Sequence, residues 1–400
     1  MNRKLVPVIV VLAIFGAVAG GVALMRRRRL VIGVMLPLTG PDAPEGLGMR
    51  NGIQLAVDEL NARGGLESKK VSLEIFDAPT PEKSVEGARE MVKSKVRAVE
   101  YGYDNETWMA PRPVLLEGGV IGLVPGFVGA ETLTASSMPR ELRLLPQASL
   151  EYSASAQYAW QIAGARKPLL VRESTQFGTI GLNHFRGGYS LVLKKKAGTP
   201  YETINRGDQS FPSVLDRYRN EHNDYVFFSG RPIEAALLIK ELRAAGYAGP
   251  FELAGQGPTQ RLLDLAKEQA EGAITVFPGV PTQDTDAGKA FLAAYAAHGF
   301  REPPGLYGMF AYATTQALLQ AMGKSFLTIP SIWGALNHEE FDTAVGKTRF
   351  FNWSTSTYQA AVVYKVVNGQ WKPIFTAEPI GPAPEGGGAR EMGLTPYAPK

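Results

Sequence analysis

Cysteine is absent from the 400 residues of this chain. Its absence excludes disulfides, zinc sites built on thiolates, thiol nucleophiles and an N-terminal lipid attached through cysteine. Histidine is scarce as well: His184, His222, His298 and His338 stand apart from one another, and no HExxH spacing occurs. We expect a surface or capping role for each of the four.

Signatures of common enzyme classes are also missing. The sequence has no GxSxG elbow, no Walker loop and no GxGxxG fingerprint. The stretch GLGMRNG at residues 46–52 lacks the lysine and the spacing of a phosphate cradle, so it predicts a tight strand-to-helix turn. Asp77 and Asp104 end strands with no evident base or metal partner. We therefore expect no enzyme activity, no cofactor and no metal site.

The positive net charge is confined to the start of the chain. Arg3, Lys4 and the four arginines at residues 26–29 are the only charged residues among the first 29, and the rest of the chain has 36 basic against 38 acidic side chains. No basic stripe interleaved with aromatic residues follows. Nucleic acid is therefore not an expected partner.

Residues 5–25 contain no charged side chain and are long enough to cross a bilayer as a helix. We expect residues 1–29 to be a retained membrane anchor with an arginine collar. Cleavage as a signal peptide after the small residues 17–19 is an alternative. Inverted topology, with the body in the cytoplasm, is a third, because basic residues on both sides of the segment nearly balance the positive-inside rule.

Strand and helix patterns alternate from residue 30 onward. RLVIGVMLP predicts a buried strand, GMRNGIQLAVDELNARGG a helix and VSLEIFDA a second strand, and the rhythm restarts after residue 146. Repeated βαβ units predict parallel sheets covered by helices on both faces, with ligands at the carboxyl ends of the strands. Two such runs predict two lobes. Residues 377–400, rich in proline and glycine, are expected to be disordered.

Residues 31–65, VIGVMLPLTGPDAPEGLGMRNGIQLAVDELNARGG, resemble the opening of a known family. The family is the type I periplasmic solute-binding proteins, in particular the leucine/isoleucine/valine-binding group of ABC-transporter receptors. YVFFSGRPIEAALLIKELRAAGYAGPF, AEGAITVFP and FDTAVGKTRF resemble later segments of the same family. The likeness extends from about residue 30 to residue 373.

The resemblance implies an α/β fold with two lobes, each a mostly parallel sheet flanked by helices, and three hinge crossovers. The crossovers are expected near residues 144–147, 277–280 and 348–351. Lobe one would comprise residues 30–145 and 279–348, and lobe two residues 146–278 and 349–376. A ligand would lie in the cleft between lobes that close by hinge bending. The resemblance also implies a periplasmic body, held at the cytoplasmic membrane by residues 5–25.

The same resemblance points to ligand-contacting positions, several of which depart from the amino-acid-binding pattern. The expected ligand-binding residues are Asn105, Thr107, Trp108, Phe127, Val128, Phe177, Arg231 and Gln256. Gln256 replaces an acidic residue that would pair with a ligand amine, which leaves a buried ammonium uncompensated. Arg231 replaces a tyrosine and adds a planar donor suited to an anion.

These changes favour a carboxylate, or another anionic or aromatic molecule, over an aliphatic amino acid. Trp108, Phe127 and Phe177 would form apolar walls. Plainer roles stay open: Arg231 could pair with Glu234 at the surface, the two phenylalanines could belong to the core, and Trp108 could pack between the lobes.

Two functions follow from the resemblance and the changed pocket. The first is a receptor that delivers a small polar or anionic molecule to an ABC permease. The second is a membrane-anchored sensor or assembly partner that uses the same fold with a degenerate pocket.

Overall fold

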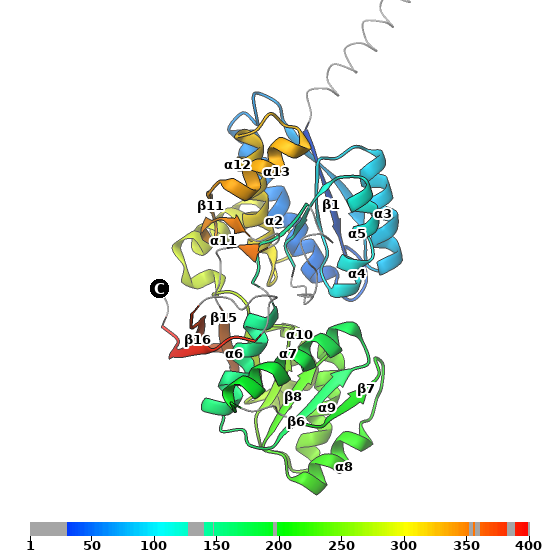
Figure 1. Ribbon diagram of the computed structural model, residues 1–400, viewed down its shortest axis with the longest axis vertical. Coiled ribbons are helices and arrows are strands. Elements are labelled where there is room, and N and C mark those ends of the chain that lie inside the picture. The colour runs from blue at the N-terminus through cyan, green and yellow to red at the C-terminus, as the bar shows by residue number, and fades with distance from the viewer. Residues whose placement is uncertain are drawn as a thin grey trace, which may run out of the picture.

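The computed structural model describes residues 30–126, 140–146, 148–194, 198–351, 355–356, 361–381 and 389–398. The chain forms two α/β lobes, one above the other in Figure 1. The expected membrane segment, residues 5–25, lies outside the described residues. Within the described part of the chain, no helix combines the length and the apolarity needed to span a bilayer.

The first lobe contains five parallel strands in the spatial order β2-β1-β3-β4-β5. They are β1 (Leu30–Leu36), β2 (Val71–Asp77), β3 (Ala98–Tyr101), β4 (Ile121–Val124) and β5 (Glu141–Arg143). Strand β1 is apolar along its length because it is covered on both faces. The chain turns to opposite sides after β1, which makes the carboxyl ends of β1 and β3 the switch point where ligands bind in such sheets.

The helices of the first lobe come from two stretches of sequence. They are α2 (Ala43–Ala62), α3 (Pro81–Lys93), α4 (Asn105–Met109), α5 (Arg112–Glu117), α11 (Asp286–His298), α12 (Gly308–Gly323) and α13 (Ile329–His338). Helix α12 packs along α2, and a Cβ built on Gly52 would lie 2.2 Å from the carbonyl oxygen of Gly308. Glycine at residue 52 therefore allows this close approach. The hairpin β11 (Phe341–Thr343) and β12 (Gly346–Thr348) follows and contacts α12.

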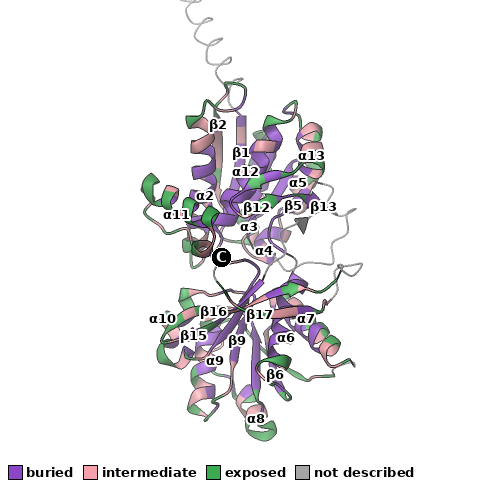
Figure 2. Ribbon diagram, turned by 90° about the vertical axis from the view of Figure 1, so that its left-hand side faces the viewer, coloured by how far each residue is buried: buried purple, intermediate pink, exposed green. Residues whose placement is uncertain are grey.

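The second lobe contains an eight-stranded sheet in the order β17-β16-β15-β10-β9-β8-β6-β7. Its strands are β6 (Pro168–Glu173), β7 (Tyr201–Ile204), β8 (Tyr225–Ser229), β9 (Phe251–Ala254), β10 (Ile274–Phe277), β15 (Ala361–Val367), β16 (Gln370–Pro379) and β17 (Met392–Pro396). Strands β6 to β10 are parallel and repeat the order of the first sheet, whereas β15 to β17 are antiparallel. Figure 2 shows buried residues along the strands of both sheets.

Five α-helices and the short 3-10 helix η2 (Lys267–Ala270) flank or connect the strands of the second sheet, and the 3-10 helix η3 (Thr282–Asp284), which follows β10, packs against α11 of the first lobe. The α-helices are α6 (Ala148–Gln161), α7 (Gln176–Val192), α8 (Pro212–Glu221), α9 (Pro232–Ala244) and α10 (Gln260–Ala266). The second switch point lies at the carboxyl ends of β6 and β8, and it faces the first lobe across the cleft.

The expectation of a disordered tail from residue 377 is wrong for part of that segment. Strand β16 continues to Pro379, and β17 pairs with it through residues 392–396. Met392 is buried, and Leu394 packs against the same cluster of side chains from α6 and the second sheet. Apolar contact therefore orders a segment whose proline and glycine content suggested disorder.

The third crossover also lies later than expected. Strand β13 (Phe350–Phe351) contacts α13, and β14 (Thr355–Ser356) contacts β5, so both belong with the first lobe. Phe350 is buried, with its ring centroid 6.3 Å from that of Phe341. The chain therefore still belongs to the first lobe at residue 356, after the expected position at 348–351, and the second-lobe strand β15 begins at Ala361.

Candidate functional site

Loops from the two switch points face each other and enclose a cavity of about 340 Å³. This volume is at the lower end of the range of about 300–1,000 Å³ for small-molecule sites. The cavity is lined by Pro41, Asp42, Pro44, Glu45, Tyr103, Asp104, Arg231, Pro232, Ile233, Gln256, Thr259, Gln260, Arg261, Asp264 and Leu306. Both lobes contribute, and carboxylates predominate on the side of the first lobe.

Arg231 is the basic group that reaches across the cleft from the second lobe. It precedes α9, and its backbone N–H donates to Glu173 Oε1 at 2.7 Å. Its Nη2 lies 3.8 Å from Asp42 Oδ2 and 3.8 Å from Asp104 Oδ2, both on the first lobe. The alternative of a surface pair with Glu234 is wrong, because Glu234 is buried and accepts a hydrogen bond from Gly207 N–H at 2.9 Å.

Asp42 and Glu45 stand at the start of α2, where the helix dipole favours negative charge. Burial raises the pKa of Asp42, and the nearby Arg231 guanidinium opposes that shift. Burial also raises the pKa of Glu45, whose Oε2 accepts a hydrogen bond from Leu306 N–H at 2.9 Å. Glu45 thus fixes the loop before α12, whereas Asp42 has a carboxylate oxygen directed at Arg231.

Asp104 forms the amino-terminal cap of the short helix α4. Its Oδ1 accepts hydrogen bonds from the backbone N–H and the hydroxyl of Thr107, at 2.8 and 2.6 Å. Thr107 is therefore occupied in a capping box and does not line the cavity. Asn105 is buried and does not line it either. Both expected contacts with the ligand are absent from the described cavity.

Trp108 belongs to the core of the first lobe rather than to a cavity wall. It has no exposed surface, and its Nε1–H donates to Glu141 Oε1 at 3.0 Å. The Arg112 guanidinium lies 4.9 Å from the centroid of the indole ring. The expected role in the ligand site is wrong because α4 turns this side chain inward, beneath the sheet.

Aromatic side chains close the deeper part of the cleft. Phe177 lines a small extension of about 40 Å³ together with Tyr103, Tyr307, Arg231 and Gln256. The Tyr103 and Tyr307 rings meet edge to face, with their centroids 6.0 Å apart. Burial and nearby carboxylates raise the pKa of Tyr103 well above its ordinary value, so its hydroxyl stays protonated. The extension thus has aromatic walls with hydroxyl donors.

The structure brings together three of the eight expected ligand contacts, Phe177, Arg231 and Gln256. Phe127 and Val128 lie outside the described residues. Asp42, Glu45, Tyr103 and Tyr307 were missed. Asp42 and Glu45 follow the TGP turn closely, and this position could have indicated a role in the site. Acidic residues at the start of a helix are also common as caps, however, so the pattern is not specific.

Glu151 is a further buried carboxyl group next to the cleft. It lies in the first turn of α6, and its Oε1 accepts a hydrogen bond from Gly255 N–H at 2.8 Å. Its Oε2 has no hydrogen-bond partner among the described residues. Burial raises its pKa well above the ordinary range. Glu151 thus holds the turn that positions Gln256.

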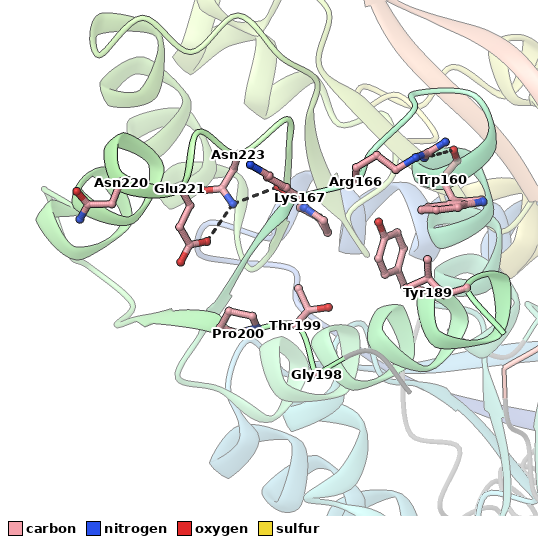
Figure 3. Close-up of a pocket in the computed structure, with 12 residues that line it drawn as sticks. Trp160, Arg166, Lys167, Tyr189, Gly198, Thr199, Pro200, Asn220, Glu221 and Asn223 are labelled. Atoms are coloured by element: carbon pink, nitrogen blue, oxygen red, sulfur yellow. Dashed lines mark hydrogen bonds between the residues drawn. The ribbon is translucent and has the colours of Figure 1, made fainter. Parts of the chain in front are cut away.

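A larger cavity, of about 850 Å³, lies on the second lobe alone. In Figure 3, Trp160, Arg166 and Tyr189 lie across from Glu221 and Asn223. The Arg166 guanidinium stacks over the Trp160 ring at 3.7 Å from its centroid. The cavity borders the start of β6, away from the carboxyl ends of the strands, so the cleft is the stronger candidate site.

Metal binding finds no support in the part of the chain that the structure describes, where no group of three or more histidine or acidic side chains could hold an ion.

Comparisons with known proteins agree with this arrangement. A family model described as periplasmic binding protein matches residues 30–370. The Leu/Ile/Val-binding protein BraC3 of Rhizobium johnstonii is 28% identical over 346 residues, which cover 84% of this chain and 91% of that protein.

Two solved structures show the same fold. The branched-chain amino acid transporter substrate-binding protein LivJ of Streptococcus pneumoniae, in complex with isoleucine, superposes with a TM-score of 0.75 at 22% identity, over 86% of this chain and 98% of that one. A solute-binding protein of an ABC transporter from R. palustris, in complex with benzoate, gives a TM-score of 0.73 at 21% identity, over 86% and 95%.

Proposed function

This chain belongs to the periplasmic binding protein family, and we propose that it is an extracytoplasmic receptor that passes a small solute to an ABC permease. The observation that carries the proposal is the charged cavity between the lobes, in which Arg231 faces Asp42 and Asp104. A ligand that bridges these groups would contact both lobes at once. Such a ligand stabilises the closed arrangement, which couples binding to hinge closure.

The ligand is a small polar molecule with a carboxylate or another anionic group. A guanidinium offers paired, planar donors that match such a group. At 3.8 Å, Arg231 makes no direct hydrogen bond with Asp42 or Asp104, so its donors are available to a ligand. Gln256 lines the same cavity and adds an amide donor.

The two aspartates add a second requirement. An anion without a donor group would meet repulsion from Asp42 and Asp104, whereas a hydroxyl or ammonium group on the ligand would pair with them. Gln256 stands where an acidic residue would pair with a ligand ammonium group, which argues against an aliphatic amino acid. Asp42 and Asp104 on the opposite wall could pair with that ammonium group instead, so an amino acid stays a candidate. The aromatic walls favour a ring. Isoleucine and benzoate, the ligands of the two similar structures, therefore both belong in the test.

We also propose that residues 5–25 remain as the anchor that holds the receptor at the cytoplasmic membrane. The length of this uncharged segment supports the proposal. Membrane fractions of cells that express the full chain should retain the protein after a carbonate wash. Recovery of a protein whose sequence begins near residue 20 would instead establish a cleaved signal.

Ligand binding is tested by thermal shift of protein that begins at Leu30. The panel contains aliphatic amino acids, benzoate, hydroxybenzoates, aliphatic carboxylates, amides and urea. A ligand at about a hundred times its dissociation constant stabilises the folded state by about 2.7 kcal/mol, which raises the melting temperature measurably. We expect the largest shift from a carboxylate that also carries a hydroxyl or ammonium group.

Variants then assign the contacts. Arg231→Ala should weaken binding of the best ligand at least tenfold. Asp42→Asn should lower the affinity for ligands that carry an ammonium or hydroxyl group more than the affinity for ligands without one. Arg219→Ala, on the exposed face of α8, is the matched control. Unchanged affinity in Arg231→Ala would refute the anion contact. If no compound on the panel shifts the melting temperature, the anchored sensor or assembly partner becomes the better interpretation.

A further inference from the structure

The amino-terminal ends of the first lobe's five parallel strands form one edge of the molecule, opposite the cleft. Leu30 begins β1, and its N–H donates to the carbonyl oxygen of Lys70, just before β2, at 3.2 Å. Arg97 precedes β3, and its carbonyl oxygen accepts from Ile121 N–H at 3.0 Å. Since neighbouring strands lie about 4.8 Å apart, Lys70 and Arg97 are separated by about 10 Å along this edge.

Four cations at this end have no ion pair among the residues that the structure describes: Arg63, Lys70, Lys95 and Arg97. We call these four residues the basic edge. Arg63 ends α2, and Lys95 follows α3, so both helices bring their last turns to the same side as the strand starts. Three other lysines nearby are paired: Lys69 with Glu67, Lys93 with Glu90 and Lys324 with Glu339.

Phe326 projects into solvent from the loop after α12, on the same end of the lobe. Its side chain is 92% exposed, whereas the adjacent Leu327 is buried. The last residue of α12, Gly323, faces the side chain of Leu66, which lies in the loop between α2 and β2. The loop thus directs one apolar side chain into the core and the other outward, beside the basic edge. This end is at the top of Figure 1, where β1 begins.

The sequence places the uncharged segment, residues 5–25, directly before four arginines and Leu30. Five residue steps separate Met25 from Leu30 and span at most about 17 Å of extended chain. A segment anchored in a bilayer would therefore hold this end of the first lobe close to the membrane surface. Electrostatic attraction to anionic headgroups acts within about 8 Å at physiological ionic strength.

We propose that the basic edge of the first lobe rests on an anionic phospholipid surface, with Phe326 inserted among the headgroups. The four cations of the basic edge complement lipid phosphates, and an aromatic ring at the interface gains from burial of its apolar surface. Charge attraction and insertion of Phe326 are each weak, but together with the anchor they fix the orientation of the first lobe on the membrane. The inference rests on the retained anchor and not on the identity of the ligand. In this posture the second lobe points away from the bilayer.

The absence of native cysteine makes a direct test possible. A single spin label is attached to the full chain in vesicles, either through Phe326→Cys or through Asp216→Cys on α8 of the second lobe. Vesicles contain either phosphatidylcholine alone or phosphatidylcholine with about 30% phosphatidylglycerol. We expect the label at residue 326 to become accessible to oxygen dissolved in lipid, and shielded from a water-soluble relaxant, only in the anionic vesicles. The label at residue 216 should stay in water in both.

Two charge-removal variants test whether the basic edge itself, and not the overall charge of the protein, holds this end at the membrane. Replacement of Arg63, Lys70, Lys95 and Arg97 by glutamine should shift the label at residue 326 back to water. A matched variant with four exposed cations of the second lobe replaced, Arg219, Lys240, Lys365 and Lys372, should behave as the parent does. The proposal fails if the label at residue 326 stays in water in anionic vesicles, if both variants act alike, or if the chain does not remain bound to the vesicles. Unchanged melting curves establish that the variants fold.

Discussion

Glu252 is a carboxyl group on β9 with no exposed surface. Tyr225 donates to its Oε2 at 2.6 Å, and the Ser155 hydroxyl donates to its Oε1. Burial raises the pKa of Glu252 to about 7, although both hydrogen bonds oppose the shift. The folded state therefore binds this proton more tightly than the unfolded state, whose carboxyl group titrates near 4.5. The contribution of Glu252 to stability is therefore complete below pH 4.5 and is lost as the pH rises from 4.5 to about 7.

Glu252→Gln should reduce the fall in the free energy of unfolding between about pH 5 and pH 8, by an amount on the order of a few kcal/mol. Glutamine retains the shape, and of the two hydroxyls one can donate to its Oε1 while the other accepts from its Nε2. The measurement is urea denaturation at the two pH values. Glu90→Gln, on the exposed surface of α3, is the control, and equal pH dependence in parent and Glu252→Gln would contradict the assignment.

Among the helices, α2 and α12 depend on glycine at their contact. A Cβ on Gly52 would overlap the Gly308 carbonyl oxygen, so the helices would have to separate. We predict that Gly52→Ala lowers the free energy of unfolding by about 1–3 kcal/mol, the usual cost of overpacking. Because the start of α2 carries Asp42 and Glu45, the same change should also weaken ligand binding.

Gly334 provides the matched control within another helix of the same lobe. It lies in α13, where a Cβ would have no heavy atom within 4 Å. Gly334→Ala should therefore stabilise the protein by about 0.5–1 kcal/mol through helix propensity alone. Denaturation curves of both variants check the pair. An equal effect in both would show that the α2–α12 contact tolerates a methyl group.

Across the whole molecule, Arg231 forms an electrostatic link between the lobes. Its two ion pairs, with Asp42 and Asp104, are long and partly exposed, so their combined contribution is about 0.5–1 kcal/mol. Loss of this link in Arg231→Ala should increase the ratio of open to closed molecules about two- to fivefold without ligand. Spin labels at Glu90→Cys and Asp216→Cys, one in each lobe, report the distance distribution. Arg219→Ala should leave it unchanged, and an identical distribution in Arg231→Ala would exclude the link.

The family and the fold class were predictable from the sequence, and both are confirmed. The βαβ rhythm is local, because each strand and helix carries its own pattern of apolar residues. The ligand site was only partly predictable. Arg231, Gln256 and Phe177 were predicted from the turns that follow strands, and they line the cavity, whereas their contact with a ligand stays a prediction. Trp108 was misassigned, because the direction of a side chain at the start of a short helix depends on what the helix packs against.

Local sequence determined the alternation of strands and helices, the unusual cation at residue 231 and the uncharged segment at residues 5–25. Tertiary structure decided which charges meet. Asp42 and Asp104 are 62 residues apart in sequence, and Arg231 lies 127 residues beyond Asp104, yet the packing of two lobes brings all three to one cavity. It also decided the place of β17, whose partner β16 supplies hydrogen bonds that composition cannot reveal. Pairing between distant segments follows from the joint burial of their apolar faces, which no local pattern encodes.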